Sequence, residues 1–274
     1  MRNKILYVLT EPNEFFYLLN KELNRLRVKF EVLNFNAKIP NIPCILVTTE
    51  DKYEKIKSRI SKKVLTIVYS KNENFNRFIV KILTSYRIGK SNFSDLTFSI
   101  DPGAKHLGLV IFLDDYFLNS CTIYEKGELI KVIKEHVDAL QENITELLSL
   151  NFKLGRGVQS ICMDLVENIY EVFKDRKNLK IQLIDESKSS RIKIHENKGR
   201  FPKHEASALI LSFRDGVEIK MNNFERKIYQ INENNNLKVI NNIKILEEIA
   251  EKVINGELSL SKTTEKLKSE ALQH

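Results

Sequence analysis

Three residues that can bind a metal ion or move a proton lie at the ends of predicted secondary-structure elements. Asp101 ends a predicted strand, Glu186 follows another strand, and His204 begins a predicted helix. Hydrolysis of a phosphodiester by paired divalent cations needs clustered oxygen ligands, with the ions about 4 Å apart, so that one ion activates water and the other stabilises the leaving oxygen. The group therefore predicts a Mg²⁺ or Mn²⁺ site, with Glu205 as a further candidate metal ligand.

Each of these residues also has a plain structural explanation when it is taken alone. Asp101 can cap the turn before Gly103, a glutamate after a strand is most often exposed, and a histidine at a helix end need not bind anything. His204 and Glu205 cannot both face a metal well, because adjacent residues of a helix point about 100° apart. It is the combination of residues that favours a site.

The elements that position these residues occur in an informative order. Hydrophobic periodicity predicts strands at 96–101, 107–113 and 116–124, a helix at 128–148, a strand at 151–154, a helix at 158–174, a strand at 179–184 and a helix at 204–214. This is the order of an RNase H-like α/β domain with a mixed sheet, which we expect over residues 95–220. Asp164 is a further candidate that ranks below the others, because the apolar residues around it predict the helix at 158–174.

Four short motifs within this region resemble one branch of that superfamily. Residues 99–109, Ser-Ile-Asp-Pro-Gly-Ala-Lys-His-Leu-Gly-Leu, resemble the opening motif of RuvC-like and YqgF-like nucleases. Residues 183–191 resemble the Asp-Glu-x-x-Thr-Ser motif of the YqgF-like group, with Ser189 in place of threonine. Residues 203–211 resemble the last helix of the family, which usually has aspartate where this chain has His204, and residues 155–157 stand where the family has a glycine-containing loop.

The resemblance covers residues 96–216 and implies an activity. It implies a divalent-metal-dependent endonuclease in which Asp101, Glu186 and His204 hold Mg²⁺ or Mn²⁺. The substrate would be structured nucleic acid, either a Holliday junction in DNA recombination or repair, or a precursor RNA in RNA processing. A homodimer is possible, because RuvC-like resolvases act as dimers.

Two other functions stay open on the residues. Because imidazole is a softer and neutral ligand, His204 in place of aspartate is also typical of a catalytically weakened protein that binds structured nucleic acid without cutting it. An Asp-x-Gly hairpin also serves sugar-kinase and actin-like ATPases as a phosphate loop. That function is disfavoured, because residues 1–90 contain neither a second glycine-rich hairpin nor a duplicate domain.

Basic side chains are concentrated between Glu186 and His204. Beside the predicted metals they would contact phosphates on either side of the scissile bond, although a solvated loop explains them as well. The predicted nucleic-acid-binding residues are Lys105, Lys188, Ser190, Arg191, Lys193, Lys198, Arg200 and Lys203.

The N-terminal third carries the net positive charge of the chain. Residues 1–90 hold 18 basic and 8 acidic residues, whereas residues 91–274 hold 26 and 28. This favours an acidic partner such as nucleic acid, or simply a lysine-rich solvated surface. The pattern strand, helix, two strands, helix, strand, helix predicts a small Rossmann-like or receiver-like domain over 1–90, which lacks a phosphate-binding glycine turn and is therefore accessory. Residues 84–94 are the predicted linker.

Composition sets the remaining expectations for this chain of 274 residues. Hydrophobic residues make up 42% of it, which suffices for a core, and no apolar run approaches the roughly 20 residues that span a bilayer. We expect a cytoplasmic protein without a secretory leader, and three distant cysteines that are buried thiols. Residues 221–274 are predicted to form a two-helix extension, which is a nucleic-acid reader, a dimerisation hairpin or part of the core.

Overall fold

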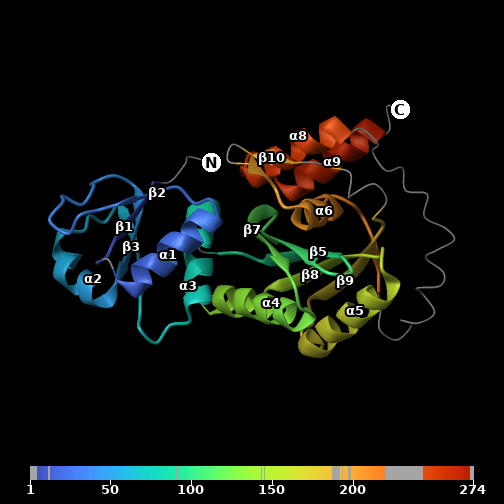
Figure 1. Ribbon diagram of the computed structural model, residues 1–274, viewed down its shortest axis with the longest axis horizontal. Coiled ribbons are helices and arrows are strands. Elements are labelled where there is room, and N and C mark those ends of the chain that lie inside the picture. The colour runs from blue at the N-terminus through green and yellow to red at the C-terminus, as the bar shows by residue number, and fades with distance from the viewer. Residues whose placement is uncertain are drawn as a thin grey trace. The chain divides into compact units, whose positions relative to one another are not determined.

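The chain folds into two compact units of mixed α/β structure, which confirms the predicted α/β class (Figure 1). The computed structural model describes residues 5–11, 13–90, 92–142, 144, 146–186, 192, 194–196, 199–219 and 243–271. One unit comprises residues 1–91 with 138–142, and the other comprises residues 92–137 with 143–274.

The first unit is built on a parallel four-stranded sheet in the order β2-β1-β3-β4. Its elements are β1 (Leu6–Leu9), α1 (Glu14–Arg25), β2 (Phe30–Val32), β3 (Cys44–Thr49), α2 (Glu50–Ile56), η1 (Lys57–Arg59), β4 (Val64–Tyr69), α3 (Phe75–Leu83) and η2 (Thr84–Ile88). The central strands β1 and β3 are almost wholly buried, as expected of parallel strands covered on both faces. All seven predicted elements are present in the expected order.

The predicted linker at 84–94 is partly wrong. Thr84–Ile88 continues α3 as a π-helical turn, which ends at Gly89 with φ 73°. Thr84 and Ile88 are buried, and the Thr84 hydroxyl donates to the carbonyl of Val80 at 2.9 Å, so the apolar face of α3 extends into this turn. The sequence interpretation ended the helix too early because Gly89 and the polar residues after it dominate the local pattern.

The second unit contains a mixed six-stranded sheet in the order β12-β9-β8-β5-β6-β7. Its strands are β5 (Asp95–Pro102), β6 (Leu107–Leu113), β7 (Tyr116–Ile123), β8 (Ser149–Gly155), β9 (Leu179–Ile184) and β12 (Val217–Glu218). β5, β6 and β7 form an antiparallel meander, β8 and β9 run parallel to β5, and β12 pairs antiparallel with β9.

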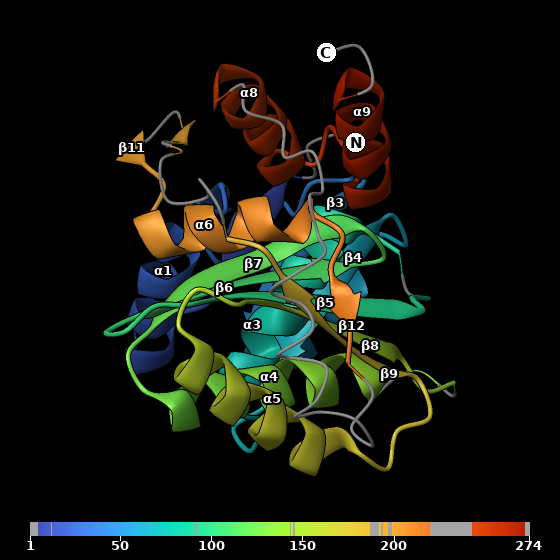
Figure 2. The ribbon, with the colours of Figure 1, turned by 90° about the vertical axis from the view of Figure 1, so that its right-hand side faces the viewer.

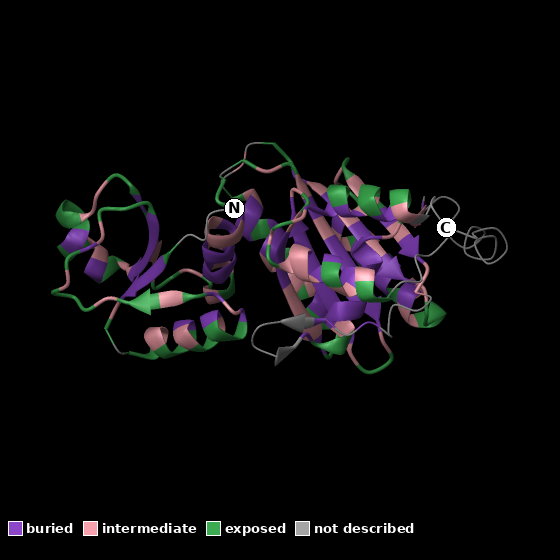
Figure 3. Ribbon diagram, turned by 90° about the horizontal axis from the view of Figure 1, so that it is seen from above, coloured by how far each residue is buried: buried purple, intermediate pink, exposed green. Residues whose placement is uncertain are grey.

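Helices cover both faces of this sheet (Figure 2). α4 (Lys126–Gln141) and α5 (Gln159–Phe173) lie on one face, and α6 (Lys203–Ser212) lies on the other. α4 begins two residues before the helix predicted at 128–148 and ends seven residues earlier than predicted. The next strand, β8, begins at Ser149, whose N–H donates to the Ser94 carbonyl. The sheet is buried between its helices, while their outer surfaces are exposed (Figure 3).

Alternation along β5 decides which side chains reach each face. Phe98 stacks on Phe152 of β8 at 5.1 Å, and Phe152 contacts Phe173 of α5 at 5.8 Å. The next residue, Ser99, points the other way and donates to the Ala208 carbonyl of α6 at 2.6 Å. Because side chains alternate with a period of two, Asp101 lies on the α6 face with Ser99.

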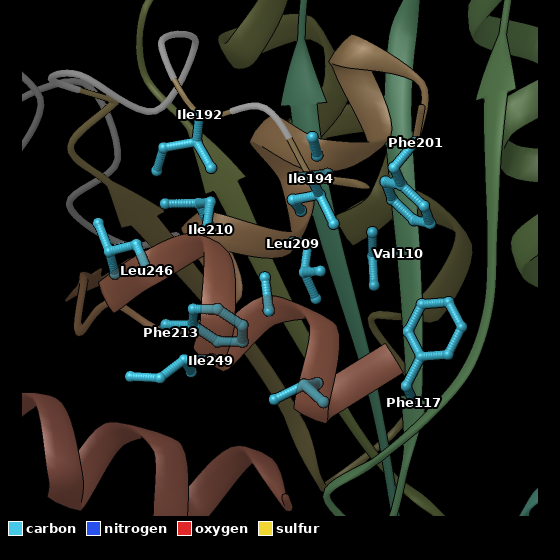
Figure 4. Close-up of a cluster of buried hydrophobic side chains, with 14 of the residues drawn as sticks. Val110, Phe117, Ile192, Ile194, Phe201, Leu209, Ile210, Phe213, Leu246 and Ile249 are labelled. Atoms are coloured by element: carbon cyan, nitrogen blue, oxygen red, sulfur yellow. The ribbon is translucent and has the colours of Figure 1, made fainter. Parts of the chain in front are cut away.

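The C-terminal helices α8 (Ile243–Ile254) and α9 (Leu260–Ala271) belong to the core on the α6 face (Figure 4). Leu246, Ile249 and Val253 of α8 are buried in one cluster with Leu209 of α6 and with Phe213, the residue after α6. Of the three alternatives for this extension, core packing is therefore confirmed.

The described part of the basic stretch before α6 contains side chains that pack into the core. Ile192, Ile194 and Phe201 are buried in the same cluster (Figure 4). A short hairpin, β10 (His195–Glu196) with β11 (Gly199–Arg200), lies between them. From the sequence, only the basic residues of this stretch were considered, and the burial of these three apolar side chains was not predicted.

Two compositional expectations can be compared with the structure. Cys44 and Cys162 are buried, but Cys121 is only partly buried, so the prediction of three buried thiols is wrong for Cys121. Among the described residues, no helix has the length and apolar character needed to cross a membrane.

Candidate metal and nucleic-acid site

Asp101 and His204 meet where the end of β5 faces the first turn of α6. Asp101 is buried, and its Oδ2 lies 3.1 Å from Nδ1 of His204. Gly108 on β6 allows this approach, because a Cβ atom at that position would lie 2.0 Å from the His204 carbonyl oxygen. Burial raises the pKa of Asp101, and the hydrogen bond and charge of His204 oppose that rise, helped by Lys203.

Glu186 is held in a cradle made by two glycines, Gly155 at the end of β8 and Gly157 in the loop after it. The Gly157 N–H donates to Glu186 Oε1 at 2.8 Å. A Cβ atom on Gly155 would lie 2.1 Å from Oε1, and one on Gly157 would lie 2.1 Å from Oε2. Any side chain at either position would therefore displace the carboxylate. The loop at 155–157, which the sequence singled out only by resemblance, has a physical role in placing Glu186.

The two carboxyl groups influence each other electrostatically. Burial raises the pKa of Glu186, and the neighbouring charge of Asp101 raises it further, while the Gly157 N–H and Arg214 favour the ionised form. A divalent cation would stabilise this pair, in which a buried carboxylate and a half-buried carboxylate repel each other. Asp101 contacts His204, and because β5, β8 and β9 are parallel, the strand ends that carry Asp101 and precede Glu186 lie at one edge of the sheet.

Glu205 is directed elsewhere. Its carboxylate accepts hydrogen bonds from the Ser120 hydroxyl at 2.6 Å and the Thr122 hydroxyl at 3.0 Å, both on β7. β7 is separated from β5 by β6, so this carboxylate lies two strands away from the strand that carries Asp101. Its contacts indicate that it anchors α6 to the sheet.

The predicted phosphate contacts are only partly visible. Lys105, between β5 and β6, and Lys203, at the start of α6, are both exposed. Lys105 is four residues after Asp101 in the sequence, and the charge of Lys203 acts on Asp101 in the fold. Lys188, Ser190, Arg191, Lys193 and Lys198 lie outside the described residues, and Arg200 is described only as backbone in β11.

Sequence reasoning missed two further neighbours of the site. Arg214 donates to the carbonyl of Asp185 at 2.5 Å, and its charge favours ionised Glu186. The ring of His106 packs edge-to-face on His204, with the ring centres 5.7 Å apart, and on Tyr124 at 4.8 Å. From the sequence, His106 was either a phosphate contact beside Lys105 or a cap of the turn, and Arg214 was the end of a helix. The local pattern does not indicate the contacts of either residue with the site.

The donor chemistry fits a divalent cation, although the ligands are not assembled around one point. In the part of the chain that the structure describes, no three side chains of His, Cys, Asp or Glu are placed to hold a metal ion together. Two carboxylates suit Mg²⁺ or Mn²⁺, and an imidazole suits Mn²⁺ better. Asp101 and Glu186 are therefore the residues most suited to hold such an ion, with His204 beside them.

Comparison with known proteins gives little guidance. No protein-family model matches the chain, and the curated proteins gave no match. Among solved structures, the chain is similar to the crystal structure of Aa-Ago, an Argonaute, with externally bound siRNA, at 12% sequence identity and a TM-score of 0.21. The similarity covers 71% of this chain and 36% of that one, so the chain spans about a third of that protein's length. A likeness this distant assigns neither a family nor an activity.

Proposed function

We propose that this chain is a divalent-metal-dependent endonuclease of the RNase H-like type, resembling the RuvC and YqgF branch. It would hydrolyse phosphodiester bonds in structured nucleic acid, either a four-way DNA junction or a precursor RNA. The proposal rests mainly on the convergence of Asp101 and Glu186, two acidic residues from β5 and from the end of β9, at one edge of the sheet. The strand order, a meander followed by two parallel strands, supports the same fold type.

In this proposal each residue near Asp101 has a separate task. A bound Mg²⁺ or Mn²⁺ supplies activation of water and stabilisation of the leaving oxygen. Asp101 and Glu186 hold the cation, and His204 either joins them or keeps Asp101 ionised through its contact at 3.1 Å. Gly157 orients Glu186 by its N–H.

Basic side chains would hold the substrate strand. Lys105 and Lys203 flank Asp101 and would neutralise phosphates next to the scissile bond. The remaining proposed contacts come from the stretch before α6, with Lys188, Ser190, Arg191, Lys193, Lys198 and Arg200. The cytoplasmic location and the possible homodimer stay predictions.

A second candidate is binding of structured nucleic acid without cleavage. The observation that favours it is the pairing of His204 with Asp101, because the ring nitrogen occupies a carboxylate oxygen that a metal would otherwise use. The absence of a three-residue metal group among the described residues points the same way.

Cleavage of a labelled substrate panel separates the two candidates. The panel contains a four-way junction, duplex DNA, single-stranded DNA and structured RNA, each with Mg²⁺ or Mn²⁺. Asp164→Asn is the matched control for Asp101→Asn, because Asp164 is exposed on α5, on the other face of the sheet, paired with Lys126. We expect cleavage by the wild type and by Asp164→Asn but not by Asp101→Asn. A shifted band without cleavage under either metal would replace the nuclease by the binding function.

A further inference from the structure

One face of the central strands in the second unit is polar where an interior sheet is normally apolar. Strand pairing aligns Thr97, Asn151 and Lys180 in one row across β5, β8 and β9. The next row contains Lys153 and Gln182. Strands at the centre of a sheet with helices on both faces usually carry apolar residues on both sides. A row of amides and lysines in this position therefore needs an explanation.

These polar side chains form the floor of a cavity of about 350 Å³ beside α9. Thr97, Asn151, Lys153 and Gln182 are only partly exposed, and Ser261 and Thr264 of α9 form a wall. The acidic residues that line the cavity, Asp115 and Glu265, are exposed at its rim. The floor thus presents an ammonium group, two amides and a hydroxyl, but no carboxylate among the described residues.

Lys153 is a charged group without an acidic partner. Two of its three ammonium hydrogens are donated to backbone carbonyls at the end of α6, those of Ser212 at 2.6 Å and Arg214 at 2.9 Å. Within the described ranges, no carboxylate lies at ion-pair distance from it. Burial lowers the pKa of Lys153 to about 8, although the more distant Asp215 opposes this shift. A half-buried ammonium group without a carboxylate partner would be stabilised by an anion that enters the cavity.

We propose that this cavity binds a phosphate group, with Lys153 as its charged partner and Thr97, Asn151 and Gln182 as hydrogen-bonding partners. Lysine, hydroxyl and amide groups are the side chains that contact the sugar–phosphate backbone in protein–nucleic acid complexes. Among the described lining residues there is no aromatic ring on which a base could stack.

The phosphate comes from the backbone of the bound strand, and this part of the inference rests on the proposed function. Thr97 and Asp101 lie on the same face of β5, four residues apart, which is about 13 Å along a strand. The cavity would therefore hold a phosphate away from the scissile one. A free nucleotide offers the same chemistry, and the experiment separates the two sources.

The experiment compares three variants of the full chain, each combined with Asp101→Asn so that no substrate is cut. Lys153→Met removes the charge, Gln182→Glu places a negative charge on the floor, and Lys174→Met is the control on the opposite face of the sheet. The probes are the labelled nucleic acids of the panel, inorganic phosphate and a nucleoside 5′-monophosphate. Binding is measured by fluorescence anisotropy across a range of salt concentrations and by the shift in Tm.

We expect Lys153→Met and Gln182→Glu to weaken binding of the strand by about tenfold or more. Lys153→Met should also reduce the slope of log affinity against log salt by about 0.7 to 0.9, because one fewer counterion is released. Lys174→Met should bind as the parent does. Should both floor variants bind strand, phosphate and monophosphate as the parent does, the inference is wrong.

The remaining outcomes are equally decisive. Loss of monophosphate binding with unchanged strand binding would keep the phosphate site and assign it to a free nucleotide, overturning the backbone assignment. If the wild type neither cuts nor binds any strand, the proposed function fails, and the Tm shift with phosphate alone then decides for or against the site. If Lys153→Met does not fold, Gln182→Glu, which keeps Lys153, gives the answer.

Discussion

A single methyl group at Gly157 should disable Glu186 while the fold stays intact. The Cβ atom of Gly157→Ala would lie 2.1 Å from Glu186 Oε2, whereas ordinary contact begins at 3.4 Å, so the carboxylate must move by about 1.3 Å. Gly157 is not among the glycines with positive φ, so the backbone accepts alanine. The carboxylate is the far end of a flexible side chain, and the main loss in folding is one hydrogen bond, about 1–2 kcal/mol.

The consequence for catalysis should be much larger than the consequence for stability. A misplacement of about 1 Å in a catalytic group can reduce a rate by about a hundredfold. We therefore expect single-turnover cleavage with Mn²⁺ to slow by about that factor in Gly157→Ala. Gly127→Ala is the control, because a Cβ there meets nothing within 4 Å. Cleavage at the wild-type rate by Gly157→Ala, alongside an inactive Glu186→Gln, would refute the role of the glycine cradle.

Three further variants test the arrangement around Asp101. Burial raises the pKa of Asp101 in the folded state, so its ionisation opposes folding, and Asp101→Asn should raise the free energy of unfolding at pH 7. In urea titrations this gain in stability should vanish below the ordinary pKa of 3.8. A gain that grows as the pH falls would contradict the prediction. Glu205→Ala should lower the free energy of unfolding by about 1–3 kcal/mol yet leave the Mn²⁺-induced rise in Tm unchanged; loss of that rise would make Glu205 a metal ligand after all. Gly108→Ala should lower the free energy of unfolding in denaturant by about 1–3 kcal/mol, since its Cβ would meet the rigid backbone of His204. A free energy of unfolding equal to that of Gly127→Ala would show that this contact is not tight.

The parts of the fold that follow from local pattern were predictable. The strand at 179–184 is found with the predicted bounds, and the helix predicted at 158–174 differs from α5 by one residue at each end. The meeting of Asp101 with His204 also followed from the order of elements. The helix α6 follows β9, and β9 runs in the same direction as β5, so the end of β5 and the start of α6 are expected at one edge of the sheet.

The orientation of α6 was not predictable. His204 and Glu205 are neighbours, and the sequence left open which of them faces Asp101. The answer depends on Gly108, a residue nearly a hundred positions earlier, on which the backbone of His204 rests. Hydroxyl groups on β7 then take the carboxylate of Glu205. Contacts of this kind couple distant positions, and periodicity within a helix contains no information about them.

The polar face of β8 is a second feature that the sequence pattern alone does not explain. Asn151 and Lys153 alternate with Leu150, Phe152 and Leu154 in the sequence, and such alternation is typical of a strand with one face in water. Only the strand order, which puts β8 between β5 and β9, makes the alternation unusual, because it moves Lys153 from an expected surface into a cavity at the centre of the sheet. A charge in that position needs hydrogen-bonding or charged partners. Lys153 has two hydrogen-bonding partners in the carbonyls of Ser212 and Arg214, and a bound phosphate would supply the negative charge that the floor of the cavity lacks.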